Sequence, residues 1–147
     1  MEPQKKPPSK TRRKSRYKIF ISYSYKDKQL ADKLALELEN SGLSIWRAEE
    51  NIYPGENWSL EIRKALYRAD AIVILITQNS AGSKWAYNEL GYALSSSRLK
   101  DRVIPVVYGR TVNMPWILKK FEPIQYDSMK EGETSKQIIR KLRKSEK

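Results

Sequence analysis

The sequence predicts an α/β fold: a parallel β-sheet with helices on both of its faces. Short apolar runs rich in β-branched and aromatic residues alternate along the chain with amphipathic stretches of helical length. The run AIVILI, residues 71–76, is apolar at every position, as expected for a central strand that is covered on both faces. A chain of 147 residues is long enough for one domain with a proper core and too short for two of ordinary size.

Periodicity and stop signals place the elements of the first half. Leucines spaced four residues apart mark the first helix, and a glycine after them marks its end. A long polar loop follows the second strand. The expected elements are, in order, a strand over 17–22, a helix carrying Leu30, Leu34 and Leu38 and ending before Gly42, a strand over 43–46 and a helix over 58–68.

The second half continues the alternation and ends in a basic helix. The expected elements are a central strand over 70–77, a helix over 83–97, strands over 102–108 and 124–127, and a helix over 134–144. Pro105 lies inside the fourth strand and has no N–H for the ladder. We therefore expect that strand to lie at a sheet edge or to be bulged there.

The net charge of +12 belongs to the two ends of the chain. Residues 1–16 carry seven Lys or Arg against one Glu, and residues 134–147 carry six against one. Because residues 1–16 offer nothing to a core, we expect a disordered basic tail before a folded domain of 17–147. No aromatic residue is interleaved with the charges of this tail, so nucleic acid is an unlikely partner, although the basic ends leave it open.

The composition excludes several classes of chemistry and of location. Cysteine and histidine are absent, which removes thiolate nucleophiles, disulfides, the usual zinc sites and any triad that needs histidine. No apolar run approaches the roughly 20 residues of a membrane-spanning helix, and no signal-peptide core precedes the first strand. A soluble cytoplasmic protein without a membrane partner or a bound metal is the expectation.

Ligands of such sheets gather at the carboxyl ends of the strands, where the strand order reverses. For the order 2-1-3-4-5 this point lies between the first and third strands, beside the loops 22–27 and 77–85. Glu89 follows Trp85 by one helical turn and is expected to face that crevice. The six glycines form neither a P-loop nor a G-x-G-x-x-G pattern, so a nucleotide would have to be bound without a glycine-rich phosphate loop.

Three segments in the expected order resemble Toll/interleukin receptor (TIR) domains of the bacterial enzymatic type. IFISYSYKD is similar to the first box of that family, RAEENIYPGENW to the loop after its second strand, and SKWAYNELGYAL to the segment that carries its catalytic glutamate. The likeness extends over roughly 17–140. It implies a flavodoxin-like, five-stranded parallel sheet in the order 2-1-3-4-5.

The resemblance also implies chemistry on NAD, as substrate and with no further cofactor. Enzymatic TIR domains cleave the bond between nicotinamide and ribose and release ADP-ribose or a cyclic isomer. The family's catalytic glutamate matches Glu89, which would stabilise positive charge developing on the ribose. By the same resemblance Tyr23 and Ser24 line the site, Trp85 forms an aromatic wall, and Gly55 shapes the loop on the nicotinamide side.

Each of these residues also has a purely structural interpretation. Glu89 fits an ordinary solvent-facing helix position, and Trp85 fits a core cap at the start of a helix. Tyr23 fits packing, and Ser24 fits a cap of the first helix. Asp27 fits a cap of that helix as well as it fits a place in the site.

Two functions from different classes remain open. The first is an NAD-consuming enzyme of bacterial defence or NAD-depletion signalling. The second is a non-catalytic adaptor that assembles through TIR-to-TIR contacts of the Ile52 to Trp58 loop, or with a sensor or effector partner. The two overlap, since the resemblance implies that enzymatic TIR domains commonly act only when assembled. Specific activity should then rise with protein concentration. A phosphoacceptor receiver domain is disfavoured, since the first strand runs into SYSY rather than clustered acids. Ala48 stands where many relatives have Asp, which leaves the setting of the second loop open.

Overall fold

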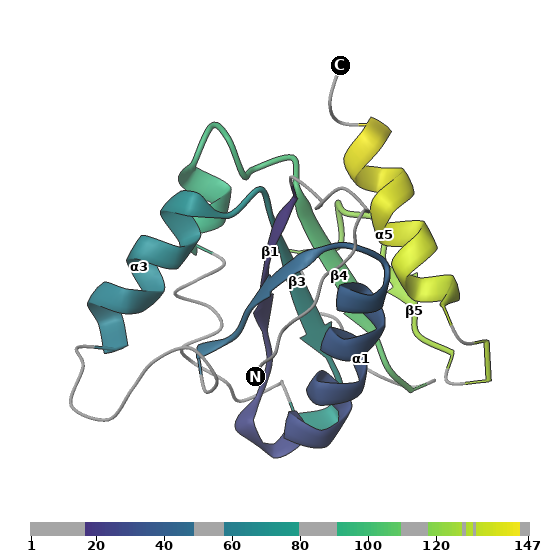
Figure 1. Ribbon diagram of the computed structural model, residues 1–147. Helices are drawn as coiled ribbons and strands as arrows, with labels where there is room; N and C mark the ends of the chain where they lie inside the picture. Colours follow the sequence, from purple (N-terminus) through teal and green to yellow (C-terminus); the bar gives the residue numbers. More distant parts are fainter. Residues whose placement is uncertain are drawn as a thin grey trace, which may run out of the picture.

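The computed structural model describes residues 17–48, 58–79, 91–109, 118–127, 129–130 and 132–144. It contains a five-stranded sheet in the order β2-β1-β3-β4-β5, in which every neighbouring pair is parallel (Figure 1). The strands are β1 Lys18–Ser22, β2 Ser44–Trp46, β3 Ala71–Ile76, β4 Val103–Val107 and β5 Ile124–Gln125. The predicted fold class and strand order are confirmed.

Helices cover both faces of this sheet. They are the 3-10 turn η1 Tyr25–Asp27, α1 Lys28–Asn40, α3 Trp58–Arg68 and α5 Glu133–Lys144. Helices α1 and α5 lie on one side, whereas α3 and the helical residues 91–95 lie on the other (Figure 1). Of the helix expected over 83–97, the described part is residues 91–95, and these are helical.

The central strand β3 shows how the two layers are held. All six of its residues are buried, and alternate side chains enter two separate apolar clusters. Val73 and Leu75 pack with α1 and α5, while Ile72 and Ile74 pack with α3 and with Ala93. Each fully buried side chain of this size contributes about 1.5–3 kcal/mol, so the strand is stabilised from both faces.

Helix α1 ends in a Schellman motif that turns the chain into β2. The Gly42 N–H donates to Glu39 O at 3.0 Å, and the Leu43 N–H donates to Leu38 O at 3.2 Å. Gly42 has φ of 94°, a conformation that costs a residue with a Cβ atom. Leu43 is buried after this turn, so the apolar contact typical of the motif is present.

The prediction that Pro105 marks an edge or a bulged strand is wrong, because β4 lies inside the sheet and pairs residue by residue with β3. Strand β4 lies between β3 and β5, and Pro105 itself is in register with Ile74 of β3. On the other side, pairing with the two-residue strand β5 begins at Val106. Pro105 therefore stands outside the β4–β5 pairs, where its missing N–H removes no ladder bond.

The basic segment 1–16 lies outside the described residues, so its predicted disorder stays a prediction. Within the described ranges, no helix combines the length and the apolar character that crossing a bilayer requires.

Replacing Gly42 by alanine should lower the free energy of unfolding by about 1 kcal/mol, because alanine resists the left-handed conformation of the helix stop. Urea unfolding of the purified chain measures this. Gly91→Ala is the matched control, since a Cβ there meets nothing within 4 Å in a helical segment and should leave stability unchanged or slightly higher. Equal effects of the two substitutions would contradict the assignment of Gly42.

Candidate functional site

The carboxyl ends of four strands surround a cavity of about 770 Å³. Its walls come from the turn after β1 and the start of α1, from the segment after β3, and from the residues after β4 and β5. The described lining residues are Lys26, Asp27, Lys28, Gln29, Leu30, Lys33, Thr77, Gln78, Asn79, Tyr108, Gly109 and Tyr126. This edge of a parallel sheet is where α/β proteins bind ligands, as expected from the strand order.

Asp27 ties the end of β1 to the end of β3. It is buried, and its two carboxylate oxygens accept hydrogen bonds from Thr77 Oγ1 and Asn79 Nδ2, both at 2.6 Å. Thr77 Oγ1 also accepts from the Asn79 N–H at 2.9 Å. Asp27 precedes α1 but makes no capping hydrogen bond with its side chain. Of the two interpretations of Asp27, the helix cap is therefore wrong, because the carboxylate is turned toward the segment after β3. A place in the site stays a prediction.

Ser24 and Tyr23 lie between β1 and this carboxylate. Ser24 is buried and caps the 3-10 turn η1, where its Oγ accepts from the Lys26 N–H at 3.3 Å. Tyr23 is 3% exposed and packs in the apolar cluster beneath α1. Both side chains thus have structural roles, and neither is among the described residues that line the cavity. Their roles in substrate binding stay predictions.

Ser22 is a polar residue that the sequence did not single out. It is fully buried at the end of β1, in register with Ile74, and its Oγ makes no hydrogen bond with a described residue. Along β1 it alternates to the face of Phe20, the face that α3 and residues 91–95 cover. A buried hydroxyl without a partner is uncommon and costs stability, so it marks this strand end as a place with spare hydrogen-bonding capacity.

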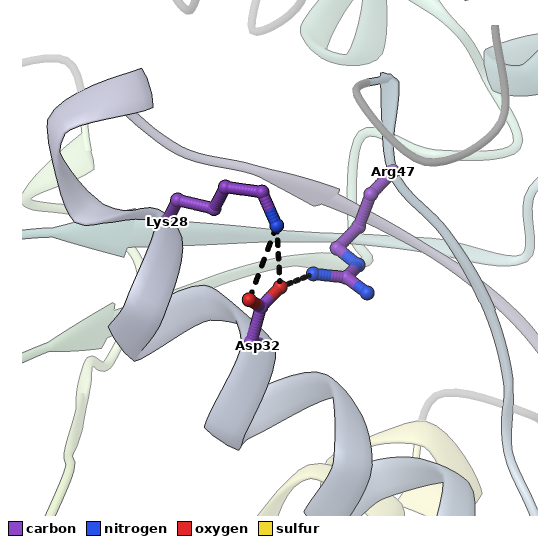
Figure 2. A network of polar contacts seen from close by, with 3 residues as sticks. All are labelled: Lys28, Asp32 and Arg47. Carbon is purple, nitrogen blue, oxygen red and sulfur yellow. Dashed lines mark hydrogen bonds and ion pairs between the residues drawn. The ribbon is translucent and has the colours of Figure 1, made fainter.

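A charged network holds the chain where it leaves β2. Figure 2 shows Arg47 reaching α1, where its Nη1 donates to Asp32 Oδ1, while Lys28 Nζ lies 3.1 Å from Asp32 Oδ2. The hydrogen bond from Arg47, followed by that from Lys28, holds the pKa of Asp32 below its ordinary value of 3.8. The next residue, Ala48, is 3% exposed, so a small apolar side chain fills this position.

Three predicted site residues, Gly55, Trp85 and Glu89, lie outside the described residues. Their roles stay predictions. The segment that carries Trp85 and Glu89 leaves the described structure just after Asn79 and re-enters it at Gly91. Among the described residues, no group of three or more acidic, histidine or cysteine side chains is placed to hold a metal ion.

The sequence pointed to the loops at this edge but missed the contacts within them. Thr77 and Asn79 belong to the segment TQNSAGSKW, and only the fold shows that they face Asp27, 50 and 52 residues earlier. The pair Tyr108 and Tyr126 was also missed. The only available signal was an aromatic residue near the carboxyl end of each of the last two predicted strands.

Comparison with known proteins identifies relatives of the whole described fold. The family model for the TIR domain matches residues 19–143. A probable 2' cyclic ADP-D-ribose synthase of Methanobrevibacter olleyae is 25% identical over 115 residues, 78% of this chain and 33% of the relative. An NAD(+) hydrolase of a Theionarchaea archaeon is 26% identical over 97 residues, 65% of this chain and 30% of the relative. The chain thus spans about a third of the length of these curated relatives.

Among solved structures, the TIR domain of a Toll-related receptor from Hydra magnipapillata superposes with a TM-score of 0.71 at 17% identity. The match covers 85% of this chain and 97% of that domain. At this identity the likeness supports the fold.

Asp27→Ala should lower the free energy of unfolding by about 1–3 kcal/mol, because it leaves the buried Thr77 hydroxyl without its acceptor. Asp101→Ala is the matched control: Asp101 is exposed, and its replacement should change stability by less than about 0.5 kcal/mol. Denaturant unfolding of both variants measures the difference. A loss for Asp27→Ala no larger than the control's would show that the tie between β1 and β3 adds no stability.

Asp32→Asn should destabilise the chain at pH 7 and progressively less in acid. Because the folded pKa of Asp32 is lowered, its contribution is fully present above the unfolded value of 3.8 and is lost as pH falls through the lower folded pKa. The pair is partly open to solvent, with 44% of the Asp32 side chain exposed, so the loss at pH 7 should stay below about 1 kcal/mol. Thermal unfolding between pH 7 and pH 3 should show the two curves converging below about pH 4. A pH-independent gap would contradict the ion pair.

Proposed function

The chain belongs to the TIR domain family, and we propose that it cleaves the bond between nicotinamide and ribose in NAD. The products are nicotinamide and either ADP-ribose or a cyclic isomer of it. NAD is the substrate and no further cofactor takes part. Two distant relatives named for NAD hydrolysis and for cyclic ADP-ribose synthesis support this reaction class.

The observation that carries the proposal is the pair of hydrogen bonds that joins the ends of β1 and β3 at the point where the strand order reverses. Asp27 holds Thr77 and Asn79 there, beside a cavity of about 770 Å³. The segment with Trp85 and Glu89 begins directly after Asn79. Because Asn79 is hydrogen-bonded to Asp27, the chain leaves β3 from a fixed position at the edge where ligands of parallel sheets bind.

One carboxylate is sufficient for the chemistry. When the glycosidic C–N bond breaks, its electron pair moves to the nicotinamide nitrogen, and positive charge develops on the ribose. We assign to Glu89 the stabilisation of that charge. Water then adds to the ribose carbon and loses a proton to give ADP-ribose, or a nucleophilic atom of the same molecule adds to give a cyclic product. The composition fits, because this sequence of events requires neither histidine nor cysteine, and the chain has neither.

Residues at the end of β1 border this edge of the sheet. Ser22 offers a buried hydroxyl without a described partner. Ser24 and Tyr23 hold the first loop in place by capping and packing, and we propose that they border the substrate. Trp85 and Gly55 complete the proposed site as the aromatic wall and the loop on the nicotinamide side.

We further propose that the reaction serves NAD-depletion signalling, as in bacterial defence, inside the cytoplasm. Self-association through TIR-to-TIR contacts is part of this proposal. Expression in bacterial cells tests the proposed depletion of NAD. Cellular NAD should fall with the parental chain and should stay level with Glu89→Gln.

Glu89→Gln should reduce nicotinamide release about a hundredfold to a thousandfold, because the amide keeps the size of the side chain but removes the charge that stabilises the ribose. Incubation of the purified chain with NAD, followed by chromatography of nicotinamide, ADP-ribose and cyclic species, measures rate and product together. Thermal unfolding should show that the variant folds as the parent does.

The matched control for this substitution is Glu61→Gln. Glu61 lies on α3, where it pairs with Lys64 at 3.5 Å, and its replacement should leave turnover unchanged. Turnover of NAD by Glu89→Gln at the parental rate would refute the catalytic assignment. The adaptor interpretation would then be the better account of the chain.

A further inference from the structure

Two kinds of side chain meet in the cavity at the carboxyl edge, and the bond cleavage assigned to Glu89 gives them no chemical role. Tyr108 and Tyr126 stand on the side of β4 and β5, and lysines stand on the side of α1. The geometry points to a binding site for a nucleoside diphosphate, with the base against Tyr108 and the diphosphate against Lys26 and Lys33.

The aromatic side of the cavity is rigidly supported. Tyr108 and Tyr126 have ring centroids 5.8 Å apart at a 42° tilt. Tyr126 is 7% exposed, whereas Tyr108 is 42% exposed. The Tyr108 N–H donates to Ile76 O at 2.9 Å, and the Tyr126 N–H donates to Val107 O at 2.8 Å. The backbone of each tyrosine is therefore held by the neighbouring strand. A held aromatic ring with open surface in a cavity is suited to stacking a flat base.

The opposite wall is electropositive. Three lysines line the cavity against one aspartate, and that aspartate, Asp27, already directs both oxygens to Thr77 and Asn79. Lys28 is paired with Asp32. Lys26 and Lys33 are exposed and make no ion pair with any residue that the structure describes. Two ammonium groups on one wall attract a diphosphate, which carries its charge on several oxygens.

Size and position agree with this ligand class. A volume of about 770 Å³ lies within the roughly 300–1,000 Å³ range of small-molecule sites. The cavity also lies at the strand ends where nucleotides bind in α/β sheets. The absence of a glycine-rich phosphate loop in the sequence is consistent with a diphosphate held by lysine side chains rather than by backbone N–H groups.

A nucleoside diphosphate can reach this cavity from two sources. It can be the ADP half of the NAD substrate, a version that rests on the proposed function, or it can be a free adenine nucleotide. Both present the same base and the same diphosphate to Tyr108, Lys26 and Lys33, and competition kinetics separate them.

Calorimetric titration of the purified chain with ADP tests the site, with adenosine and pyrophosphate as separate halves. ADP should bind more tightly than either half. Tyr108→Ala should weaken ADP binding about tenfold or more, and Tyr108→Phe should restore it because the ring is kept. Lys33→Gln should weaken it about fivefold and should flatten its dependence on salt.

The matched control is Lys136→Gln, which removes one exposed lysine from α5, away from the cavity, and should leave ADP binding unchanged. Thermal unfolding of each variant accompanies the titrations. If Tyr108→Ala does not fold, the double variant of Lys26→Gln and Lys33→Gln decides, because both side chains are exposed and their loss leaves the core intact.

Absence of ADP binding at millimolar concentration would overturn the inference. So would binding that Tyr108→Ala and Lys33→Gln leave unchanged. If ADP binds and raises the apparent KM for NAD without changing kcat, the cavity holds the ADP half of the substrate. If ADP binds and the KM for NAD is unchanged, it holds a free nucleotide.

The result is independent of NAD cleavage, because ADP binding is also measured on Glu89→Gln. A chain that binds ADP at this cavity but does not cleave NAD would refute the proposed function and leave the nucleotide site standing. A chain that cleaves NAD but does not bind ADP would refute the nucleotide site alone.

Discussion

The burial of β3 on both faces is the constraint on which the rest of the structure depends. All six of its residues are covered, so neither face can be left to solvent, and helices must pack on both. Parallel pairing with β1 and β4 then requires a crossover after each strand, and every crossover starts at the same edge of the sheet. The loops that follow β1, β3, β4 and β5 are brought to one edge by this requirement.

Every parallel sheet gathers loops at its carboxyl edge, and here polar side chains fix how those loops are arranged. Asp27 is the central group, because its two oxygens take one bond each from Thr77 and Asn79. A buried carboxyl group with a hydrogen-bond donor on each oxygen restrains both loops. On the neighbouring side, Asp32 and Arg47 fasten the end of β2 to α1 (Figure 2). The first and second crossovers therefore both begin from positions set by charged hydrogen bonds.

The distribution of positive charge has two separate physical roles. Much of the net charge lies at the ends of the chain, including the outer face of α5, whose apolar residues Ile138 and Leu142 are buried against the sheet. The lysines of the cavity belong to the nearly neutral middle of the sequence, and their effect comes from being placed together around one volume. An overall count of charge therefore describes solubility and long-range attraction, and the cavity depends on local arrangement.

The sequence by itself determined the fold class, the strand order through the family resemblance, and the bounds of most elements to within a few residues. It could do so because these features are set by residues close together in the sequence. They are the spacing of the apolar residues, the glycine after α1 and the length of each apolar run. The positions of Pro105 and Asp27 were decided only by the tertiary structure. A proline is tolerated inside β4 because β5 is too short to pair with it, and Asp27 accepts hydrogen bonds from two residues that follow β3 rather than capping the adjacent helix. Both outcomes depend on residues far away in sequence, which no local pattern encodes. The meeting of Tyr108 and Tyr126 with Lys26 and Lys33 was likewise decided by strand order, since only the parallel sheet brings those four side chains to one cavity.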